Sequence, residues 1–280
     1  MGNSWRLIGD QGNYITQNSF KQVDTFREGL APFVGFNNDY SLSGYINATG
    51  EIEIQLEEQL FVNIDGLAGF FHRRALVYKT RPSLFDWRFG GPDSARRRAY
   101  GLMNPQGEIV VRPRYDYIDI QSGCLAVIVE GDRYGAIDLD GNVIIPPTFS
   151  YIGDFSEGLA IAQKIANGKY GYIDSRGKFV IDPIQEISYP PSNSGNLEFP
   201  ERRNFYDGRA LYKNRDGKYG YINRAGEIVI APVFDEAFPF EDGVAKFKNS
   251  DSWGYLDISG TIIWQSADIQ NSDHSLNHVF

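Results

Sequence analysis

The sequence predicts an all-β fold built from about seven copies of one short hairpin-forming repeat. Three observations predict it: glycines recur in pairs at a fixed offset, Asn or Asp stands before the second glycine of each pair, and aromatic and β-branched residues flank this turn. The composition agrees. Tyr (17), Phe (19) and Gly (30) are plentiful and Met (2) is rare, which favours strands and tight turns over helices.

The glycine pairs keep an offset of six residues. The pairs are Gly44 and Gly50, Gly101 and Gly107, Gly135 and Gly141, Gly171 and Gly177, Gly220 and Gly226, and Gly254 and Gly260. Three residues before each second glycine stands Asn47, Asn104, Asp138, Asp174, Asn223 or Asp257. Asx-x-x-Gly is typical of a type I turn that a left-handed glycine closes into a hairpin. A seventh, degraded copy opens the chain, with Trp5-Arg6 in place of the aromatic-Gly pair and Gly12 at the second position.

The segments around each turn have the pattern of strands, as in Tyr172-Ile173 before the turn and Phe179-Val180-Ile181 after it. Proline follows twelve residues after four of the first glycines, at Pro113, Pro147, Pro183 and Pro232. Because Pro cannot donate to a ladder, we expect the second strand to end or bend there. An aromatic segment then leads to a connector of a polar residue, Gly and an apolar strand. The six connectors begin at Glu28, Asp65, Ser122, Glu157, Asp207 and Asp242.

This pattern resembles the WG-repeat family, also called KWG repeats. Its hallmark is an aromatic-Gly pair followed by Tyr-Ile-Asp, x-x-Gly-Lys and a connector ending in Phe-Ser-Glu-Gly-Leu-Ala, and Tyr170-Gly171-Tyr172-Ile173-Asp174 carries it most clearly. The resemblance covers nearly the whole chain and is strongest over residues 100–264. It implies a mostly bacterial binding or scaffolding module without known catalysis. No functional residue carries over, because the shared positions are turn and strand positions.

We expect one repeat array over residues 1–280. The predicted repeats lie near residues 1–31, 32–68, 100–126, 127–160, 161–210, 211–245 and 246–264. Residues 69–99 and 184–204 break the pattern and are predicted insertions, and residues 265–280 form a tail.

The repeat length favours one of two architectures. First glycines are 34 residues apart from Gly101 to Gly135 and 36 apart from Gly135 to Gly171, which suits a propeller blade or a solenoid coil. The tail segment 273–280 loosely imitates a connector strand, and as a closing strand it would complete a ring without exposed edges. We therefore favour a seven-bladed β-propeller-like ring. The alternative is an open, twisted β-repeat solenoid.

Composition and charge indicate the cellular compartment of the protein and the kinds of partner that it can bind. One cysteine, Cys124, cannot form an internal disulfide, and no secretory signal opens the chain, so we expect a cytoplasmic protein. The sequence contains no run of eighteen apolar residues, so it predicts no membrane-spanning segment. The net charge of −9 argues against nucleic acid as a partner, because such proteins need cations that displace counterions from phosphate. We expect a monomer with an unidentified protein partner.

The first insertion is the candidate partner-binding segment. Residues 69–99 hold eight Lys and Arg against two Asp, a net charge of +6, while the rest of the chain carries −15. Arg and Trp are prominent at interface hot spots. The candidate residues are Arg73, Arg74, Arg81, Trp87, Arg88, Arg96, Arg97 and Arg98. The alternative is that this segment neutralises the acidic body of its own protein.

Signals for catalysis are weak. The histidines His72, His274 and His278 do not form a convincing metal pattern, and Asp138 to Asn142 resembles a calcium loop but has turn residues at the same positions in other copies. We expect no catalytic residue, metal or cofactor. The aromatics before the first glycines are expected to pack between sheets rather than to form a binding stripe; these are Tyr100, Tyr134, Tyr170, Tyr219 and Trp253.

The leading hypothesis is a non-enzymatic protein-interaction or scaffolding module. The alternative is an enzyme or a carbohydrate- or small-ligand-binding propeller whose central pocket gathers Tyr, Asp and Arg side chains from several blades.

Overall fold

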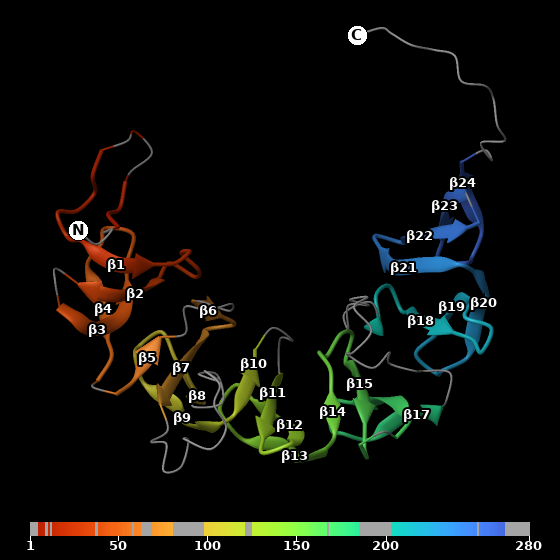
Figure 1. Ribbon diagram of the computed structural model, residues 1–280, viewed down its shortest axis with the longest axis horizontal. Helices are drawn as coiled ribbons and strands as arrows, with labels where there is room; N and C mark the ends of the chain where they lie inside the picture. The colour runs from red at the N-terminus through yellow and green to blue at the C-terminus, as the bar shows by residue number, and fades with distance from the viewer. Residues whose placement is uncertain are drawn as a thin grey trace, which may run out of the picture. The chain divides into compact units, whose positions relative to one another are not determined.

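The computed structural model describes residues 5–8, 11, 13–36, 39–57, 59–62, 69–80, 98–120, 125–166, 168–184, 203–250 and 252–266. Every named element in this part of the chain is a β-strand, and the strands form antiparallel sheets (Figure 1). The all-β prediction is therefore confirmed. The chain divides into two compact units, residues 1–148 and 149–280, which are described separately.

The first unit contains three sheets. Sheet 1 consists of β1 (Phe20–Val23), β2 (Ala31–Phe36), β3 (Asp39–Ile46) and β4 (Ile52–Gln55). Sheet 2 consists of β5 (Phe61–Val62), β6 (Phe70–Phe71), β7 (Arg74–Thr80), β8 (Arg98–Met103) and β9 (Ile109–Tyr115). Sheet 3 consists of β10 (Tyr117–Asp119), β11 (Leu125–Glu130), β12 (Arg133–Asp138) and β13 (Val143–Phe149), whose end reaches the boundary between the units.

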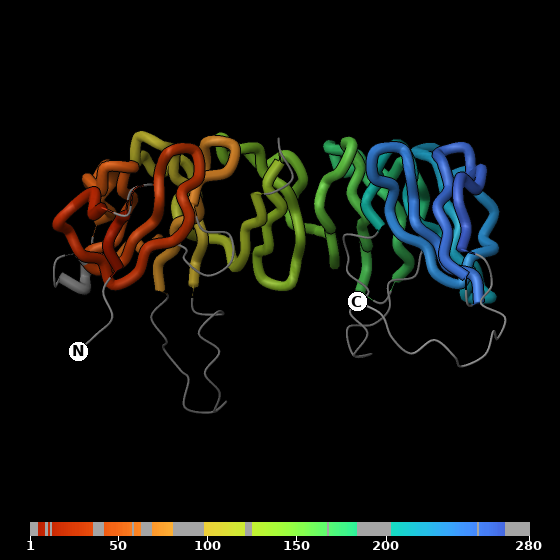
Figure 2. Tube along the Cα trace, turned by 90° about the horizontal axis from the view of Figure 1, so that it is seen from above, coloured from red at the N-terminus to blue at the C-terminus, as the bar shows by residue number. Residues whose placement is uncertain are grey.

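The second unit also contains three sheets. Sheet 4 consists of β14 (Tyr151–Ile152), β15 (Leu159–Gln163), β16 (Tyr170–Asp174) and β17 (Phe179–Ile184). Sheet 5 consists of β18 (Ala210–Lys213), β19 (Tyr219–Ile222) and β20 (Ile228–Phe234). Sheet 6 consists of β21 (Glu236–Glu241), β22 (Val244–Asn249), β23 (Ser252–Asp257) and β24 (Ile262–Gln265). The tube view shows neighbouring strands running side by side within each sheet (Figure 2).

The predicted turns form as expected, and Asp174 to Gly177 shows how. The Gly177 amide donates to the Asp174 carbonyl at 2.9 Å, and Gly177 has a φ of 79°. The Asp174 carboxylate accepts the amides of Arg176 at 2.9 Å and Lys178 at 3.0 Å. In the matching turn of sheet 3, the side-chain hydrogen bond from Asn142 lowers the pKa of Asp138. The side chain of the Asx residue therefore fixes each reversal.

The first glycine of each pair leaves space for the neighbouring backbone. A Cβ on Gly171 would lie 2.4 Å from the Ile181 carbonyl oxygen and 2.8 Å from the Pro183 nitrogen. The register between β16 and β17 shifts at this point, so the proline lies opposite an irregular step in the ladder. The prediction was that the strand ends or bends at Pro183. β17 continues to residue 184, and its register with β16 is irregular at this point, as expected for the second alternative.

The connectors tie each sheet to the next. The Glu157 carboxylate accepts the Gly208 amide at 3.0 Å, and the Asp207 carboxylate accepts the Gly243 amide at 2.7 Å. In the first unit, Glu28 accepts the Arg73 amide at 3.0 Å in the same way. A hydrogen bond to a charged acceptor is stronger than one between neutral groups. The acidic residue before the connector glycine therefore links consecutive sheets.

Residues 69–80, within the predicted first insertion, belong to sheet 2. His72 and Arg73 have φ values of 50° and 60°, close to those of Glu157 (51°) and Gly158 (76°), so they form the same connector turn. β7 then pairs with β8 as the other connector strands pair with their hairpins. The connector expected at residues 65–68 lies outside the described residues, and the inserted segment is shorter than the sequence pattern indicated.

Hydrophobic side chains between consecutive sheets form the core. On the last three strands of each sheet we follow one set of three residues that lie opposite one another, at the position that Tyr172 occupies in sheet 4. We call this set the stacking row of the sheet. The rows are Pro32, Tyr45 and Ile54 in sheet 1; Leu76, Leu102 and Val111 in sheet 2; Ile161, Tyr172 and Ile181 in sheet 4; Leu211, Tyr221 and Ile230 in sheet 5; and Lys246, Tyr255 and Trp264 in sheet 6.

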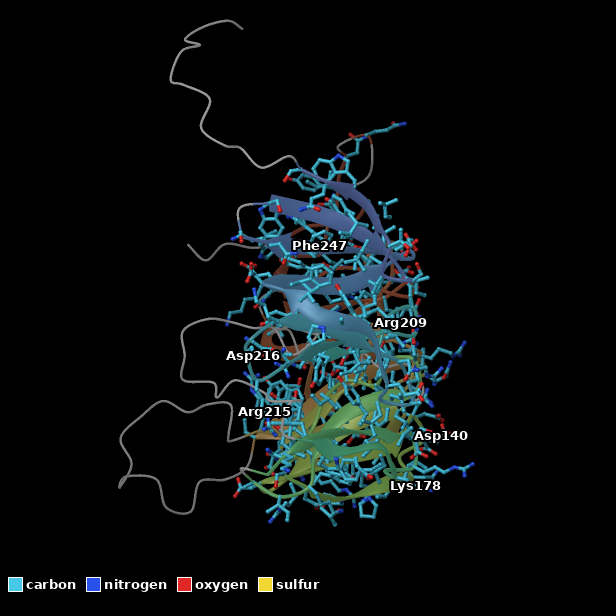
Figure 3. The ribbon with its side chains drawn as sticks, turned by 90° about the vertical axis from the view of Figure 1, so that its right-hand side faces the viewer. Asp140, Lys178, Arg209, Arg215, Asp216 and Phe247 are labelled. Carbon is cyan, nitrogen blue, oxygen red and sulfur yellow. The ribbon has the colours of Figure 1, made fainter. Side chains whose placement is uncertain are left out.

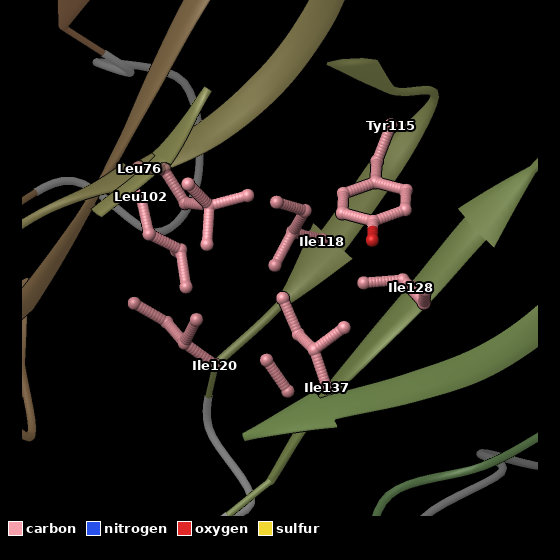
Figure 4. Close-up of a cluster of buried hydrophobic side chains, with 9 residues drawn as sticks. Leu76, Leu102, Tyr115, Ile118, Ile120, Ile128 and Ile137 are labelled. Carbon is pink, nitrogen blue, oxygen red and sulfur yellow. The ribbon is translucent and has the colours of Figure 1, made fainter. Parts of the chain in front are cut away.

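The rows of sheets 1, 2, 4 and 5 are buried against the following sheet. Figure 4 shows the cluster in which Leu76 and Leu102 of sheet 2 meet Ile118, Ile128 and Ile137 of sheet 3. The other clusters repeat this arrangement, and a tyrosine of one sheet meets a phenylalanine of the next. The ring centroids are 4.8 Å apart for Tyr45 and Phe70, 4.9 Å for Tyr172 and Phe205, and 4.8 Å for Tyr221 and Phe240.

The described part of the degraded first copy packs against sheet 1 and is held by isolated backbone bridges. Ile8 and Tyr14 form an isolated bridge, and the Ile15 amide donates to the Leu7 carbonyl at 3.0 Å. A Cβ on Gly50 would lie 2.6 Å from Thr16, as one on Gly260 would lie 3.2 Å from Ile230 of sheet 5. The N-terminal hairpin thus contacts sheet 1 as sheet 5 contacts sheet 6. Gly12 itself lies outside the described residues.

The closed ring remains a prediction. Residues 267–280, which include the proposed closing strand at 273–280, lie outside the described part of the chain, as do residues 185–202 of the second insertion. Arg203, at the end of that insertion, is buried beside sheet 4.

The buried tyrosines allow a matched stability prediction. The Tyr172 hydroxyl donates to the Arg203 carbonyl at 2.8 Å, whereas the buried Tyr45 hydroxyl has no partner among the described residues. Burial raises the pKa of both hydroxyls, so both stay protonated at neutral pH. We expect Tyr172→Phe to lower the free energy of unfolding by about 1 kcal/mol and Tyr45→Phe to leave it unchanged or raise it. Urea unfolding measures both, and equal losses would contradict the assignment.

Candidate interaction surface

The structure describes three of the eight candidate residues from the basic segment, namely Arg73, Arg74 and Arg98. The remaining five lie outside the described residues: Arg81, Trp87, Arg88, Arg96 and Arg97. Their proposed role in partner binding remains a prediction.

Arg74 joins sheet 2 to sheet 3. Its Nε donates to the Leu139 carbonyl at 2.7 Å, and its guanidinium forms an ion pair with Asp140 at 2.8 Å. Arg209 occupies the same connector position in sheet 5 and donates to the Ile258 carbonyl of sheet 6 at 3.3 Å (Figure 3). Because the contact recurs at a second sheet boundary, we assign Arg74 a structural role in holding neighbouring sheets together.

Arg73 and Arg98 differ in their surroundings. The Arg73 side chain is exposed, and its residue occupies a left-handed position that glycine fills in other connectors. Arg98 begins β8, and its guanidinium lies 4.3 Å from the ring centroid of Tyr78 on β7. Of the three described arginines, Arg73 therefore has the side chain most available to a partner.

The aromatics before the first glycines pack at the margins of the core. Tyr100, Tyr170 and Tyr219 are half-buried and contact the hydrophobic clusters between sheets, as predicted. Cations from the neighbouring connector strand cover two such rings. The Lys213 Nζ lies 4.7 Å from the Tyr219 centroid, and the Lys246 Nζ lies 4.2 Å from the Trp253 centroid. These rings therefore do not form an open stripe.

Sheet 6 differs from the other sheets, because its stacking row is open. The Tyr255 side chain is 42% exposed and Trp264 is 54% exposed. The matching residues of sheet 5, Tyr221 and Ile230, are 0% and 6% exposed. Lys246 completes the row at a position where sheet 5 has the buried Leu211, and it is exposed as well.

The open row combines aromatic surface with positive charge. The Tyr255 and Trp264 ring centroids are 6.0 Å apart at an interplanar angle of 45°. Beside them, the ammonium groups of Lys246 and Lys248 lie 4.2 Å and 5.4 Å from the Trp253 ring centroid. Phe247, which is labelled in Figure 3, precedes Lys248 on β22 and is buried in the hydrophobic cluster between sheets 5 and 6. Exposed Trp and Tyr beside cations are typical of surfaces that bind proteins.

Sequence reasoning missed this surface, although the repeat alignment contains its signal. Lys246 stands where other connectors have Ile161 or Leu211, and Trp264 stands where other hairpins have a β-branched residue. Such changes are informative only once it is known which strand positions face a neighbouring sheet.

Two further features are absent from the described residues. The described residues contain no helix that is long and apolar enough to cross a membrane. The described residues also contain no group of three or more His, Cys, Asp or Glu side chains placed to hold a metal ion.

Comparison with solved structures gives distant likenesses. BamB from Moraxella catarrhalis is 12% identical, with a TM-score of 0.40, over 88% of this chain and 75% of that one. A virginiamycin B lyase from Staphylococcus aureus is 18% identical, with a TM-score of 0.33, over 89% of this chain and 84% of that one. A eukaryotic initiation factor is 11% identical, with a TM-score of 0.38, over 87% of this chain and 75% of that one.

No curated protein matches the sequence. The family model described as "WG containing repeat" matches residues 100–133, 134–170, 170–184 and 219–252. These stretches contain the aromatic-Gly pairs of β8, β12, β16 and β19. They also contain the Asx-x-x-Gly turns that join these strands to the next strand of each hairpin. The chain therefore contains WG repeats over residues 100–184 and 219–252.

Proposed function

We propose that this chain is a non-enzymatic interaction module that binds a protein partner through the open stacking row of sheet 6. The observation that carries the proposal is the exposure of Tyr255 and Trp264 at positions that are buried in sheets 1, 2, 4 and 5. Solvent-exposed aromatic surface of this kind is unfavourable in water and gains free energy when a partner covers it.

The surroundings of the row support a protein partner. Lys246 and Lys248 place two cations beside the aromatic rings, where Lys248 also forms an ion pair with Glu236 at 3.6 Å, in a chain with a net charge of −9. A surface with an aromatic centre and charged margins matches the usual anatomy of a protein interface. The basic segment is a second contact in this proposal, with Arg81, Arg88, Arg96 and Arg97 as its cations.

A capture experiment with matched variants tests the proposal. The immobilised full chain, the double variant Tyr255→Ser/Trp264→Ser and the control Ile262→Ser/Ile263→Ser are each exposed to the same lysate. Ile262 and Ile263 are exposed, as are the matching Ile228 and Val229 of sheet 5, so the control removes exposed apolar surface without changing the row.

We expect at least one protein to bind the wild-type chain and the control but not the row variant. That protein must then bind the wild-type chain as a purified pair with fixed stoichiometry. Equal capture of every protein by all three forms would overturn the role of the row. A separate variant with Arg81, Arg88, Arg96 and Arg97 changed to Ser tests the basic segment in the same way.

A further inference from the structure

The N-terminal hairpin exposes the face opposite to the one that it packs on sheet 1. Leu7 occupies the position of Tyr255, and Ile8 occupies the position of Leu256. Because successive side chains of a strand point to opposite faces, Ile8 lies on the face opposite to the stacking row. Ile8 is 59% exposed. Its equivalents are 0% or 1% exposed, namely Ile46, Met103, Ile137, Ile222 and Leu256.

Inside each unit, residues at the Ile8 position are covered by the stacking row of the preceding sheet. Ile222 of sheet 5 shares a cluster with Tyr172 and Ile181 of sheet 4. Leu256 of sheet 6 shares another with Tyr221 and Ile230 of sheet 5. Each boundary therefore pairs a row on one sheet with this apolar residue on the next.

Two halves of this recurring contact lack a partner within their own unit. Among the described residues of 149–280 the row of sheet 6 packs against no following sheet, and among those of 1–148 Ile8 packs against no preceding one. Glu157 and Asp207 each accept a hydrogen bond from the following connector, and among the described residues Asp242, which begins the connector of sheet 6, accepts none of this kind. One unit thus exposes a stacking row, and the other exposes the apolar position that such a row covers within each unit.

We propose that the partner bound by the open row is a second copy of this chain, associated head to tail. The row of Lys246, Tyr255 and Trp264 in one copy covers the Ile8 face of the next. This inference rests on the proposed function and names its partner. A contact between two different patches is heterologous, so successive copies add in one direction and form chains or closed rings of subunits.

The charges of the row are compatible with this contact. Lys246 keeps its ammonium 4.2 Å from the Trp253 ring, so its charge retains a favourable partner while its aliphatic stem is covered. Each copy carries a net charge of −9, and the copies therefore repel one another over long distances. Salt screens that repulsion, and association is expected to strengthen between about 20 mM and 300 mM salt.

Sedimentation of the full chain with two complementary variants tests the proposal. One variant carries Tyr255→Asp and Trp264→Asp, which blocks the row. The other carries Ile8→Asp, which blocks the opposite face. Ile263→Asp is the control, because Ile263 is 57% exposed outside the row.

We expect the average mass of the wild-type chain and of the control to rise with protein concentration. For each blocked variant alone we expect the association constant to fall by at least about a hundredfold, because association would bury a carboxylate without a partner. An equimolar mixture of the two blocked variants is expected to form dimers and nothing larger, since one intact row meets one intact Ile8 face. Circular dichroism establishes that both variants are folded.

Three results would overturn the proposal. The first is a wild-type chain that stays monomeric at every concentration and salt, and the second is an Ile8→Asp variant that associates as the wild type does. The third is a mixture of the variants that stays monomeric. If association fails while the row variant still loses a captured protein, the proposed function stands and only the identity of the partner is wrong.

Discussion

Gly220→Ala is expected to lower the free energy of unfolding by about 3 kcal/mol or more. A Cβ on Gly220 would lie 2.4 Å from the Ile230 carbonyl oxygen and 2.7 Å from the Pro232 nitrogen. Both atoms belong to the backbone of β20, which cannot move without breaking its pairing with β19. The clash therefore separates two strands of sheet 5.

Gly243→Ala is the matched control for this prediction. Gly243 has a φ of 80°, but no atom lies within 4 Å of the Cβ position, so only the backbone conformation is unfavourable. That strain costs about 1 to 2 kcal/mol. Urea unfolding of both variants gives the comparison. A Gly220→Ala variant as stable as Gly243→Ala would show that the first glycine is not required by the close approach of β20.

Phe240→Ala is expected to lower the free energy of unfolding by about 3 to 5 kcal/mol. Phe240 is 2% exposed, and its ring centroid lies 4.8 Å from that of Tyr221 on the preceding sheet. Removing the ring leaves a cavity between sheets 5 and 6 and takes away an edge of the cluster that contains Leu211 and Leu256.

Phe26 provides the matched control, because it precedes its connector acid by two residues as Phe240 does. It is 39% exposed. We expect Phe26→Ala to cost about 1 kcal/mol or less, since a half-exposed ring loses little buried area. Thermal unfolding of both variants measures the difference. Equal losses would contradict the conclusion that stability resides in the contacts between sheets.

The hairpins were predictable from the sequence because their signals are local. Asp174 and Gly177 lie within one turn, and the chemistry of that turn depends only on the side-chain acceptor and the left-handed glycine. The place of Arg74 was not predictable. Its connector has His72-Arg73 where the others have Glu, Asp or Ser followed by Gly, so the pattern assigned the segment to an insertion.

The candidate site required knowledge of distant contacts. Whether Tyr255 is buried depends on whether another sheet packs against sheet 6. Strand periodicity predicts the face on which a side chain lies, but it does not predict what covers that face. The concentration of positive charge drew attention to residues 69–99. Arg74, however, donates a hydrogen bond to the Leu139 carbonyl and forms an ion pair with Asp140 within the fold. Composition alone does not separate structural arginines from those available to a partner.

Hydroxyl-radical footprinting of the full chain tests the central claim most directly, namely that stacking rows are buried between sheets and that the row of sheet 6 is open. In dilute solution, Tyr255 and Trp264 are expected to oxidise rapidly while Tyr45, Tyr172 and Tyr221 stay protected. Comparable oxidation of all five residues, or protection of Trp264 together with oxidation of Tyr221, would contradict it.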